Sequence, residues 1–376
     1  MIYADYNATT PCLPDAARLM TRMLCEDFGN PSNRASLFGR TARGAIDLAR
    51  EQMARAAGAF PDEVIFTSGA TEACNMAIFG VMERLMRERP RILTSAIEHP
   101  AVCMPAEACA SAGAEWIEIP VDGRGRLDLE ALTEALASPT ALVCVMAANN
   151  ETGVRQNIAE VVKRAHAAGA LVFCDMTQLL GKVPFSVHTE QVDFACFSAH
   201  KCYGPKGIGA LYKRRGLALS PLLRGGGQEN GLRSGTENVP AIAGFGLAAD
   251  LAAREVNVRR AHLQKLSTQL ESEVRRRIPG VVIQSAEAER IPGTSMFSCP
   301  GLRGKWLAQL SGIVASSGSA CASLQEKPSH VLQAMGVDPE TAARSIRISL
   351  GMPSTPADVR QIAQALAKGA EKLRET

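Results

Sequence analysis

The sequence lacks any run of about 18 apolar residues, which is the length that a membrane-spanning helix needs. It has no CxxC pair, and its eleven cysteines are an odd number. These absences exclude a transmembrane helix and argue against a zinc cluster or a secreted disulfide framework. No charged-then-apolar signal segment opens the chain, so we expect a protein of the reducing cytoplasm.

An excess of charge of one sign is also lacking, because 41 basic residues stand against 38 acidic ones. This balance gives no electrostatic reason to expect direct nucleic-acid binding. No G-x-x-x-x-G-K-[ST] loop occurs, since the Gly-Lys pairs at 181–182 and 304–305 are followed by Val183 and Trp306. No G-x-G-x-x-G segment opens a helix after an early strand, so a nucleotide is a poor candidate ligand.

The chain is long, has a hydrophobic content of 46% and shows a regular alternation of strand-like and helix-like stretches. Its 376 residues suffice for about two domains with a large core. The strands expected between residues 60 and 215 are 64–67, 91–95, 115–119, 141–147, 171–174, 193–197 and 209–213. Helix-like stretches between them include 70–89, 128–137 and 157–168. This pattern predicts an α/β fold with a mostly parallel central sheet and helices on both faces.

A smaller α+β region is expected after the glycine-rich segment 224–231. Its elements would be a long helical stretch at 238–277, strands at 281–284, 295–298 and 345–350, and a closing helix at 356–374. We therefore expect a large domain of residues 15–250. The small domain would combine residues 1–14 with 251–376.

Polar residues directly follow five of the expected strands. In parallel strands these positions share one edge of the sheet, where such folds bind their ligands. The segments are TSGATE at 67–72, EHPAV at 98–102, NNETG at 149–153, DMTQ at 175–178 and SAHKCYGPKG at 198–207. Each one alone is compatible with a turn or a helix cap, but five together predict a ligand site.

Three of these segments suit three parts of one cofactor. The SGATE turn with Thr71 can hold a phosphate at a helix start, although a simple N-cap has the same pattern. Asp175 ends an apolar strand and suits a protonated ring nitrogen, unless it is a solvated loop acid or an N-cap. Lys201, between His200 and a Gly-Pro turn, suits a Schiff-base lysine or else a surface loop. Together they describe pyridoxal 5′-phosphate (PLP).

The cysteines fall into two kinds of surroundings. Cys144, Cys174 and Cys196 lie in apolar runs and are expected in the core. Cys321 lies in SSGSACAS, residues 316–323, among Ser, Gly and Ala. The residues alone leave two interpretations of Cys321 open, a reactive thiol and small-residue packing.

Ten segments, in order and with nearly gap-free spacing, resemble the NifS/IscS-type cysteine desulfurases, which are PLP enzymes of the class V aminotransferase group with fold type I. The segments are DYNATTP (5–11), FGNPSNR (28–34), FTSGATEACN (66–75), EHPAV, NNETGV, DMTQ, SAHKCYGPKGIGALY, GGGQENGLRSGTEN (225–238), SSGSACAS and SIRISLG (345–351). The resemblance extends from about residue 2 to about residue 374.

The resemblance implies a cofactor role for each matching position. Lys201 would hold PLP as a Schiff base, Asp175 would pair with the ring nitrogen, and Gln178 would bind the ring 3′ oxygen. His99 would stack on the ring and help to move protons. The phosphate ligands would be Ala70, Thr71, Ser198, His200 and Thr236, the last of these reaching the site of the partner subunit in an obligate homodimer.

The resemblance also implies the substrate and the path of its sulfur. Asn150 and Arg347 would bind the carboxylate of L-cysteine, although the residues alone favour an ion-paired strand-edge arginine. Cys321 would take the substrate sulfur as a persulfide, release alanine and carry the sulfur to an acceptor protein. Its small-residue loop would cost little to move. The acceptor would serve iron-sulfur cluster assembly or the thiolation of tRNA, a cofactor or DNA.

Alternatives remain open beside the cysteine desulfurase. One is a related PLP lyase acting on selenocysteine or cystine, or an aminotransferase, and Cys321 argues against simple transamination. Another is a catalytically silent PLP-fold protein that carries sulfur or binds partners. The complete set of Lys201, Asp175, His99 and Cys321 argues against that alternative.

Overall fold

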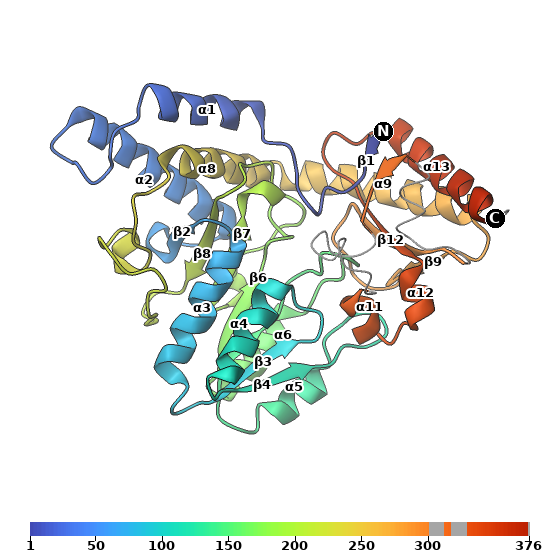
Figure 1. Cartoon of the computed structure of the whole chain (residues 1–376), viewed down its shortest axis with the longest axis horizontal. Coiled ribbons are helices and arrows are strands. Elements are labelled where there is room, and N and C mark those ends of the chain that lie inside the picture. The colour runs from blue at the N-terminus through green and yellow to red at the C-terminus, as the bar shows by residue number, and fades with distance from the viewer. Residues whose placement is uncertain (301–311, 317–328, 375–376) are drawn as a thin grey trace.

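The computed structural model describes residues 1–300, 312–316 and 329–374 (Figure 1). Its central sheet has seven strands in the order β2-β8-β7-β6-β5-β3-β4. They are β2 (Val64–Thr67), β3 (Arg91–Ser95), β4 (Glu115–Ile119), β5 (Thr140–Cys144), β6 (Leu171–Asp175), β7 (Phe194–Ser198) and β8 (Gly209–Lys213). Within this sheet β8 runs in the direction opposite to that of the other six strands. The predicted α/β fold with a mostly parallel sheet is confirmed.

Helices cover both faces of this sheet (Figure 1). One core contains side chains of α2 (Leu37–Ala57), α6 (Ile158–Ala167) and α8 (Val239–Arg254), and the other contains side chains of α3 (Ala70–Leu85) and α4 (Pro100–Ser111). On β5, Val143 belongs to the first core, whereas Leu142 and Cys144 belong to the second. Because both faces of the strand are buried, its sequence is apolar without alternation.

The predicted elements differ from the observed ones mainly at their ends. β5 ends at Cys144 rather than at 147, and α3 ends at Leu85 rather than at 89. The expected long helix 238–277 is two helices, α8 and α9 (Val256–Arg277), because Glu255 leaves the helical conformation with ψ of 3°. Further helices in the described part of the chain are α1 (Pro14–Cys25), α5 (Leu129–Ala135), α7 (Val187–Glu190), α11 (His330–Ala334) and α12 (Pro339–Ala343).

A second sheet is antiparallel and has the order β12-β10-β9, with β9 (Val282–Gln284), β10 (Thr294–Ser298) and β12 (Ser345–Ser349). Leu263 of α9 and Leu366 of α13 (Pro356–Arg374) share a core with Ile348 of β12. The N-terminal strand β1 (Ile2–Tyr3) pairs with β11 (Ile313–Val314), and Asp5 bridges to Ser349. The first residues of the chain therefore lie beside its C-terminal strands (Figure 1).

The helices of the described ranges were also compared with the length and hydropathy that a bilayer requires. None of them is long and apolar enough to cross a membrane.

Candidate active site

Five strand ends open into one cavity of about 440 Å³. Because β2, β3, β5, β6 and β7 are mutually parallel, the segments that follow them meet at one edge of the sheet. The predicted site residues that line the cavity are Ala70, Thr71, His99, Asn150, Asp175, Gln178, Ser198, His200, Lys201 and Arg347. The structure thus brings together ten of the twelve predicted site residues.

The turn into α3 lies at this cavity. The helix begins at Ala70 after Gly69, so its first backbone N–H groups have no acceptor within the helix. They form the positive end of the helix dipole, which suits an anion. A side chain at Gly209 would place its Cβ 2.6 Å from the carbonyl carbon of Gly69 and from the oxygen of Phe197. Glycine at 209 therefore allows β8 to lie against the turn.

Asp175 ends β6 and is 9% exposed. Its Oδ1 accepts a hydrogen bond of 2.9 Å from the N–H of Thr177. The thiols of Cys74 and Cys196 lie near this carboxylate, 3.6 Å from each other. Burial raises the pKa of the Cys196 thiol well above its ordinary value, so this cysteine is neutral. Cys144, Cys174 and Cys196 are fully buried, as predicted.

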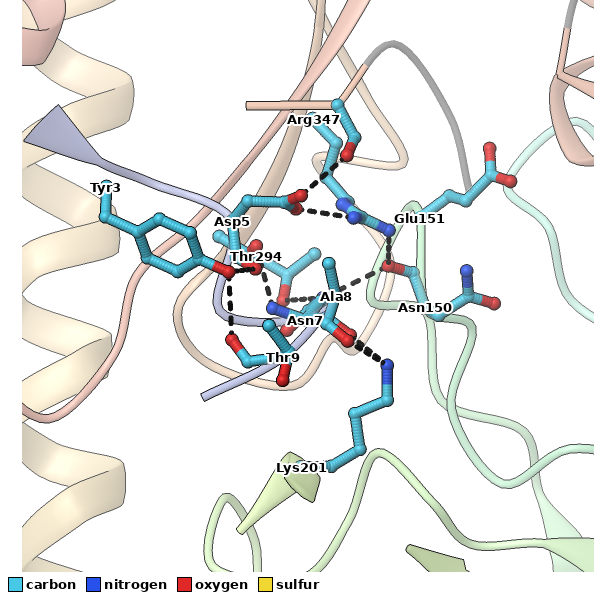
Figure 2. A network of polar contacts seen from close by, with 12 residues as sticks. Tyr3, Asp5, Asn7, Ala8, Thr9, Asn150, Glu151, Lys201, Thr294 and Arg347 are labelled. Atoms are coloured by element: carbon cyan, nitrogen blue, oxygen red, sulfur yellow. Dashed lines mark hydrogen bonds and ion pairs between the residues drawn. The ribbon is translucent and has the colours of Figure 1, made fainter. Parts of the chain in front are cut away.

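Lys201 ends the short 3₁₀ helix that follows β7, residues Ala199–Lys201. Its Nζ donates to the carbonyl oxygens of Asn7 at 2.6 Å and of Ala8 at 2.7 Å (Figure 2). The neighbouring His200 has its Nδ1 at 3.1 Å from Thr9 Oγ1. Burial, followed by the charges of Lys201 and Lys206, lowers the pKa of His200 to about 4. The imidazole of His200 is therefore neutral near pH 7.

His99 is the N-cap of α4, and its Nδ1 accepts a hydrogen bond of 3.0 Å from the N–H of Ala101. In the neutral ring the proton is therefore on Nε2. Burial lowers the pKa of His99 and Asp175 opposes that change, while Lys201 and His330 reinforce it. The ring is thus neutral at pH 7 and can donate through Nε2.

Glu98 precedes His99 and is fully buried. Its Oε1 accepts from Ser95 Oγ at 2.5 Å and from the N–H of Met146 at 2.7 Å. Burial raises the pKa of Glu98 to about 8. The sequence argument assigned no role to this carboxyl group, although EHPAV contains it.

Arg347 projects from β12 and is 1% exposed. Its Nη2 donates to Asp5 Oδ1 at 2.6 Å and its Nη1 to the backbone oxygen of Asn150 at 3.0 Å (Figure 2). The ion pair that the residues alone favoured is therefore present. Its Nε is buried and has no partner among the described residues. One donor of the guanidinium thus remains for a ligand.

Two predicted site residues do not line the cavity. Thr236 is exposed in the loop before α8, in an adjoining pocket that shares Ser68 and Gly207 with the cavity. Cys321 lies outside the described residues.

Two further residues escaped the sequence argument. Asn7 donates through Nδ2 to the oxygen of Asn150 at 3.1 Å and to Thr294 Oγ1 at 2.9 Å. The DYNATTP segment that contains Asn7 was matched as a motif without a role for this side chain. Lys182 is buried beside Gln178. The sequence feature that could have indicated a buried lysine is its position in the otherwise apolar stretch LLGKVPF, residues 179–185.

Comparison with known proteins covers the whole chain. The aminotransferase class-V family model matches residues 2–362. Cysteine desulfurase IscS of Dictyoglomus turgidum is 42% identical over 376 residues, which are 99% of this chain and 95% of that protein. The structure of a NifS-like protein superposes with a TM-score of 0.92 at 37% identity over 100% of both chains. The structure of SspA in complex with cysteine gives a TM-score of 0.83 at 31% identity over 93% of this chain and 99% of that one.

The doubly covered sheet and the family match together define a member of the class-V aminotransferases, and the chain belongs to that family. Enzymes of this family depend on PLP. Within it, the chain is a cysteine desulfurase of the IscS/NifS type, like its full-length relatives at about 40% identity. The predicted family, fold type and enzyme class are confirmed.

Proposed function

We propose that this chain binds PLP in the cavity and converts L-cysteine to L-alanine, with the sulfur passing to Cys321 as a persulfide. One observation carries the proposal: Lys201, Asp175 and the N-terminus of α3 line the same cavity. An amine, a buried carboxylate and a helix N-terminus suit the aldehyde, the ring nitrogen and the phosphate of one cofactor.

The cofactor roles follow the position of each group. Lys201 would bind the aldehyde, Asp175 the ring nitrogen and Gln178 the ring 3′ oxygen, while His99 would lie against the ring. The phosphate would be bound by Ala70, Thr71, Ser198 and His200, all of which line the cavity. The fit is supported by Lys182, which is 8% exposed and has no carboxylate partner among the described residues, because an anionic ligand would offset positive charge on its amine.

Bound PLP withdraws electrons from the α-carbon of an amino-acid substrate. The protein would hold that substrate by its carboxylate, through Arg347 and Asn150. Arg347 Nε, which is buried and has no acceptor among the described residues, supports this role, since a buried donor normally has an acceptor. Lys201 Nζ and His99 Nε2 are the nitrogens that would hold and move protons in the cavity.

The sulfur transfer would balance without an outside oxidant. The thiolate of Cys321 attacks the sulfur of the substrate, so an S–S bond forms while the substrate C–S bond breaks. The electron pair of the C–S bond stays with carbon, which takes up a proton and becomes the methyl group of alanine. The sulfur is oxidised to the persulfide level and the carbon is reduced. An acceptor protein would then take the sulfur for iron-sulfur cluster assembly or for thiolation.

We propose a homodimer in which Thr236 completes the phosphate site of the partner subunit. The exposure of Thr236 outside the cavity supports this role. Leu24 and Phe28 line a further pocket together with Thr236, and they are 61% and 66% exposed. Large exposed apolar side chains favour a protein interface there. Sedimentation equilibrium should give twice the chain mass, and a fully active monomer would contradict the proposal.

We also propose the two-domain division into residues 15–250 and residues 1–14 with 251–376. The second core, which contains Ala4 together with residues of α9 and α13, supports it. The expected location is the cytoplasm, where reductants keep thiols free for exchange.

The activity can be tested directly with purified protein. We expect a yellow holoenzyme that releases alanine and sulfide from L-cysteine in equal amounts in the presence of a reductant. Cys321→Ala should keep the colour and lose turnover, while Cys25→Ala, at an exposed cysteine, should keep both.

Each other outcome has a definite meaning. Full activity of Cys321→Ala would contradict the persulfide step. A colourless protein that PLP cannot restore would favour the silent PLP-fold protein. Turnover of selenocysteine or cystine without turnover of L-cysteine would favour the related lyase.

A further inference from the structure

Lys182 is a buried lysine beside the cavity, and its two resolved partners are neutral. Its Nζ lies 2.7 Å from Asn7 Oδ1 and 2.5 Å from Gln178 Oε1. Lys182 is 8% exposed, and it forms no ion pair with a carboxylate in the described part of the chain. Pairing with a carboxylate therefore does not explain why this amine is buried, and its two hydrogen bonds to amide oxygens indicate another role.

The chemistry of the lysine fixes the orientation of both amides. An ammonium group donates and never accepts, and a neutral amine still has N–H groups to donate. The oxygen atom of each carboxamide therefore faces the protonated Lys182. The carbonyl oxygens of Asn150 and Asn7, which accept from the NH₂ groups of Asn7 and Gln178, fix the same orientation when the amine is neutral. A flip of Asn7 or Gln178 would place its amide oxygen against a carbonyl oxygen, that of Asn150 or of Asn7, and would lose that hydrogen bond.

The nitrogen atoms of the two amides consequently face away from Lys182. Gln178 Nε2 donates to the carbonyl oxygen of Asn7 at 3.2 Å. The same oxygen accepts from Lys201 Nζ at 2.6 Å. The NH₂ group of Gln178 and the amine of Lys201 thus share one acceptor in the cavity wall, and they lie close together.

We propose that Lys182 is a positioning residue, which holds Gln178 so that its NH₂ group faces the ring oxygen of PLP and binds that oxygen in its anionic form. The inference rests on the proposed function for its ligand. The ring oxygen and the aldehyde are neighbours on PLP, which matches the closeness of Gln178 Nε2 to Lys201 Nζ. A group that only donates favours an anionic oxygen over a hydroxyl group.

The electrostatics of the region agree with an anionic ligand. Burial lowers the pKa of Lys182 well below its ordinary value, and the charges of Lys201 and Arg347 lower it further. Any positive charge on Lys182 is therefore subject to repulsion from Lys201 and Arg347. An anionic oxygen at Gln178 would reduce that repulsion.

The test is a pH titration of the visible absorbance of the PLP-loaded protein. Lys182→Met should raise the midpoint by about one pH unit or more, because the ring oxygen loses an oriented donor and holds the titrating proton more tightly. Lys182→Gln keeps a donor without the charge and should give a smaller rise. Lys163→Met is the matched control at an exposed lysine of α6 and should leave the midpoint unchanged.

A double-mutant cycle tests whether the effect passes through Gln178. In the combined Lys182→Gln and Gln178→Leu variant, the shift should be smaller than the sum of the two single shifts. Additive shifts would mean that Lys182 acts by charge alone and would overturn the positioning role. An unchanged midpoint in Lys182→Gln and Lys182→Met would overturn the inference entirely.

The outcome also separates this inference from the proposed function. If the wild-type chain takes up no PLP, the proposed function fails. If the wild-type chain is yellow and only the Lys182 prediction fails, the proposed function stands. Should Lys182→Met not fold, the cycle with Lys182→Gln decides, because it retains a polar side chain at the buried position.

Discussion

Two walls enclose the cavity, and they are built in different ways. The strand-end wall consists of the segments after β2, β3, β5, β6 and β7, and it presents reactive side chains such as Lys201 and Asp175. The N-terminal wall consists of residues 5–9 with Arg347, and toward Lys201 it presents backbone carbonyl groups (Figure 2). Reactive groups and the groups that orient them therefore come from different regions of the chain.

The N-terminal wall depends on a polar network because its segment has little regular structure. The hydroxyl group of Tyr3 donates to the carbonyl oxygens of Asp5 at 3.0 Å and Thr9 at 3.1 Å. Asp5 pairs with Arg347, and its other oxygen accepts from Ser316 Oγ at 2.7 Å. We infer that loss of the reactive side chains of the strand-end wall mainly reduces activity, whereas loss of the Asp5 carboxylate from the N-terminal wall mainly reduces stability.

The largest effect is expected for Lys201→Ala, in the strand-end wall. Loss of the amine removes the covalent anchor of PLP and a proton carrier, so turnover of L-cysteine should fall about 10⁴-fold or more. Alanine formation by the PLP-saturated variant measures the effect. Lys163→Ala, at an exposed lysine, should be fully active. A loss of turnover below tenfold for Lys201→Ala would contradict the inference that the strand-end wall mainly determines activity.

The next effect is expected for Asp5→Ala, in the N-terminal wall. Arg347 would then be a buried charge without its carboxylate, so the free energy of unfolding should fall by about 3–5 kcal/mol. Denaturant unfolding of the PLP-free protein measures it. The matched control is Asp15→Ala, which breaks an exposed pair with Arg18 and should cost less than about 1 kcal/mol. Equal costs for the two variants would contradict the buried network.

A smaller effect is expected for Gly209→Ala, under the turn into α3. The added Cβ would meet rigid backbone atoms of Gly69 and Phe197 at 2.6 Å, so the variant should lose about 1–3 kcal/mol of stability. Gly44→Ala is the control, because helix α2 leaves open space there and alanine should add about 1 kcal/mol. Thermal unfolding of both variants should therefore shift in opposite directions, and a stabilised Gly209→Ala would be inconsistent with the close approach.

At neutral pH the smallest effect is expected at His200, which joins the two walls through Thr9, and this effect grows as the pH falls. Its pKa is about 4 in the folded protein and near 6.5 when unfolded. Between these pH values the unfolded chain binds a proton that the folded protein does not bind. The contribution of His200 to the free energy of unfolding is therefore fully present above pH 6.5 and is lost as the pH falls toward 4. Unfolding of the PLP-free protein across this range should show the decline, and His200→Asn should flatten it. An unchanged slope in His200→Asn would assign the decline to other groups.

The sequence argument succeeded for the strand-end wall because its signals are local. Apolar runs such as 171–174 and the polar residues that follow them define strand ends, and the parallel order brings those ends to one edge. The lining positions of Asp175 and Lys201 required no knowledge of distant contacts.

The N-terminal wall could not be predicted from local sequence patterns, because its contacts join distant parts of the chain. The backbone N–H of Asn7 binds Ser349 Oγ, and its side chain binds Lys182 and Thr294. No periodicity of residues 1–14 indicates these partners. The family resemblance includes DYNATTP, but the hydrogen bonds between its carbonyl groups and Lys201 are seen only in the folded structure.

The bond between Asn7 and Ser349 also sets an order of events during synthesis. The ribosome makes Asn7 before its hydrogen-bond partner on β12, which follows 342 residues later. Contacts at such sequence separation form late in folding, and domains fold from the N-terminal side during translation. Residues 5–9 therefore reach their final contacts only after β12 is made, and a nascent chain that still lacks β12 has no complete cavity in which to bind its cofactor.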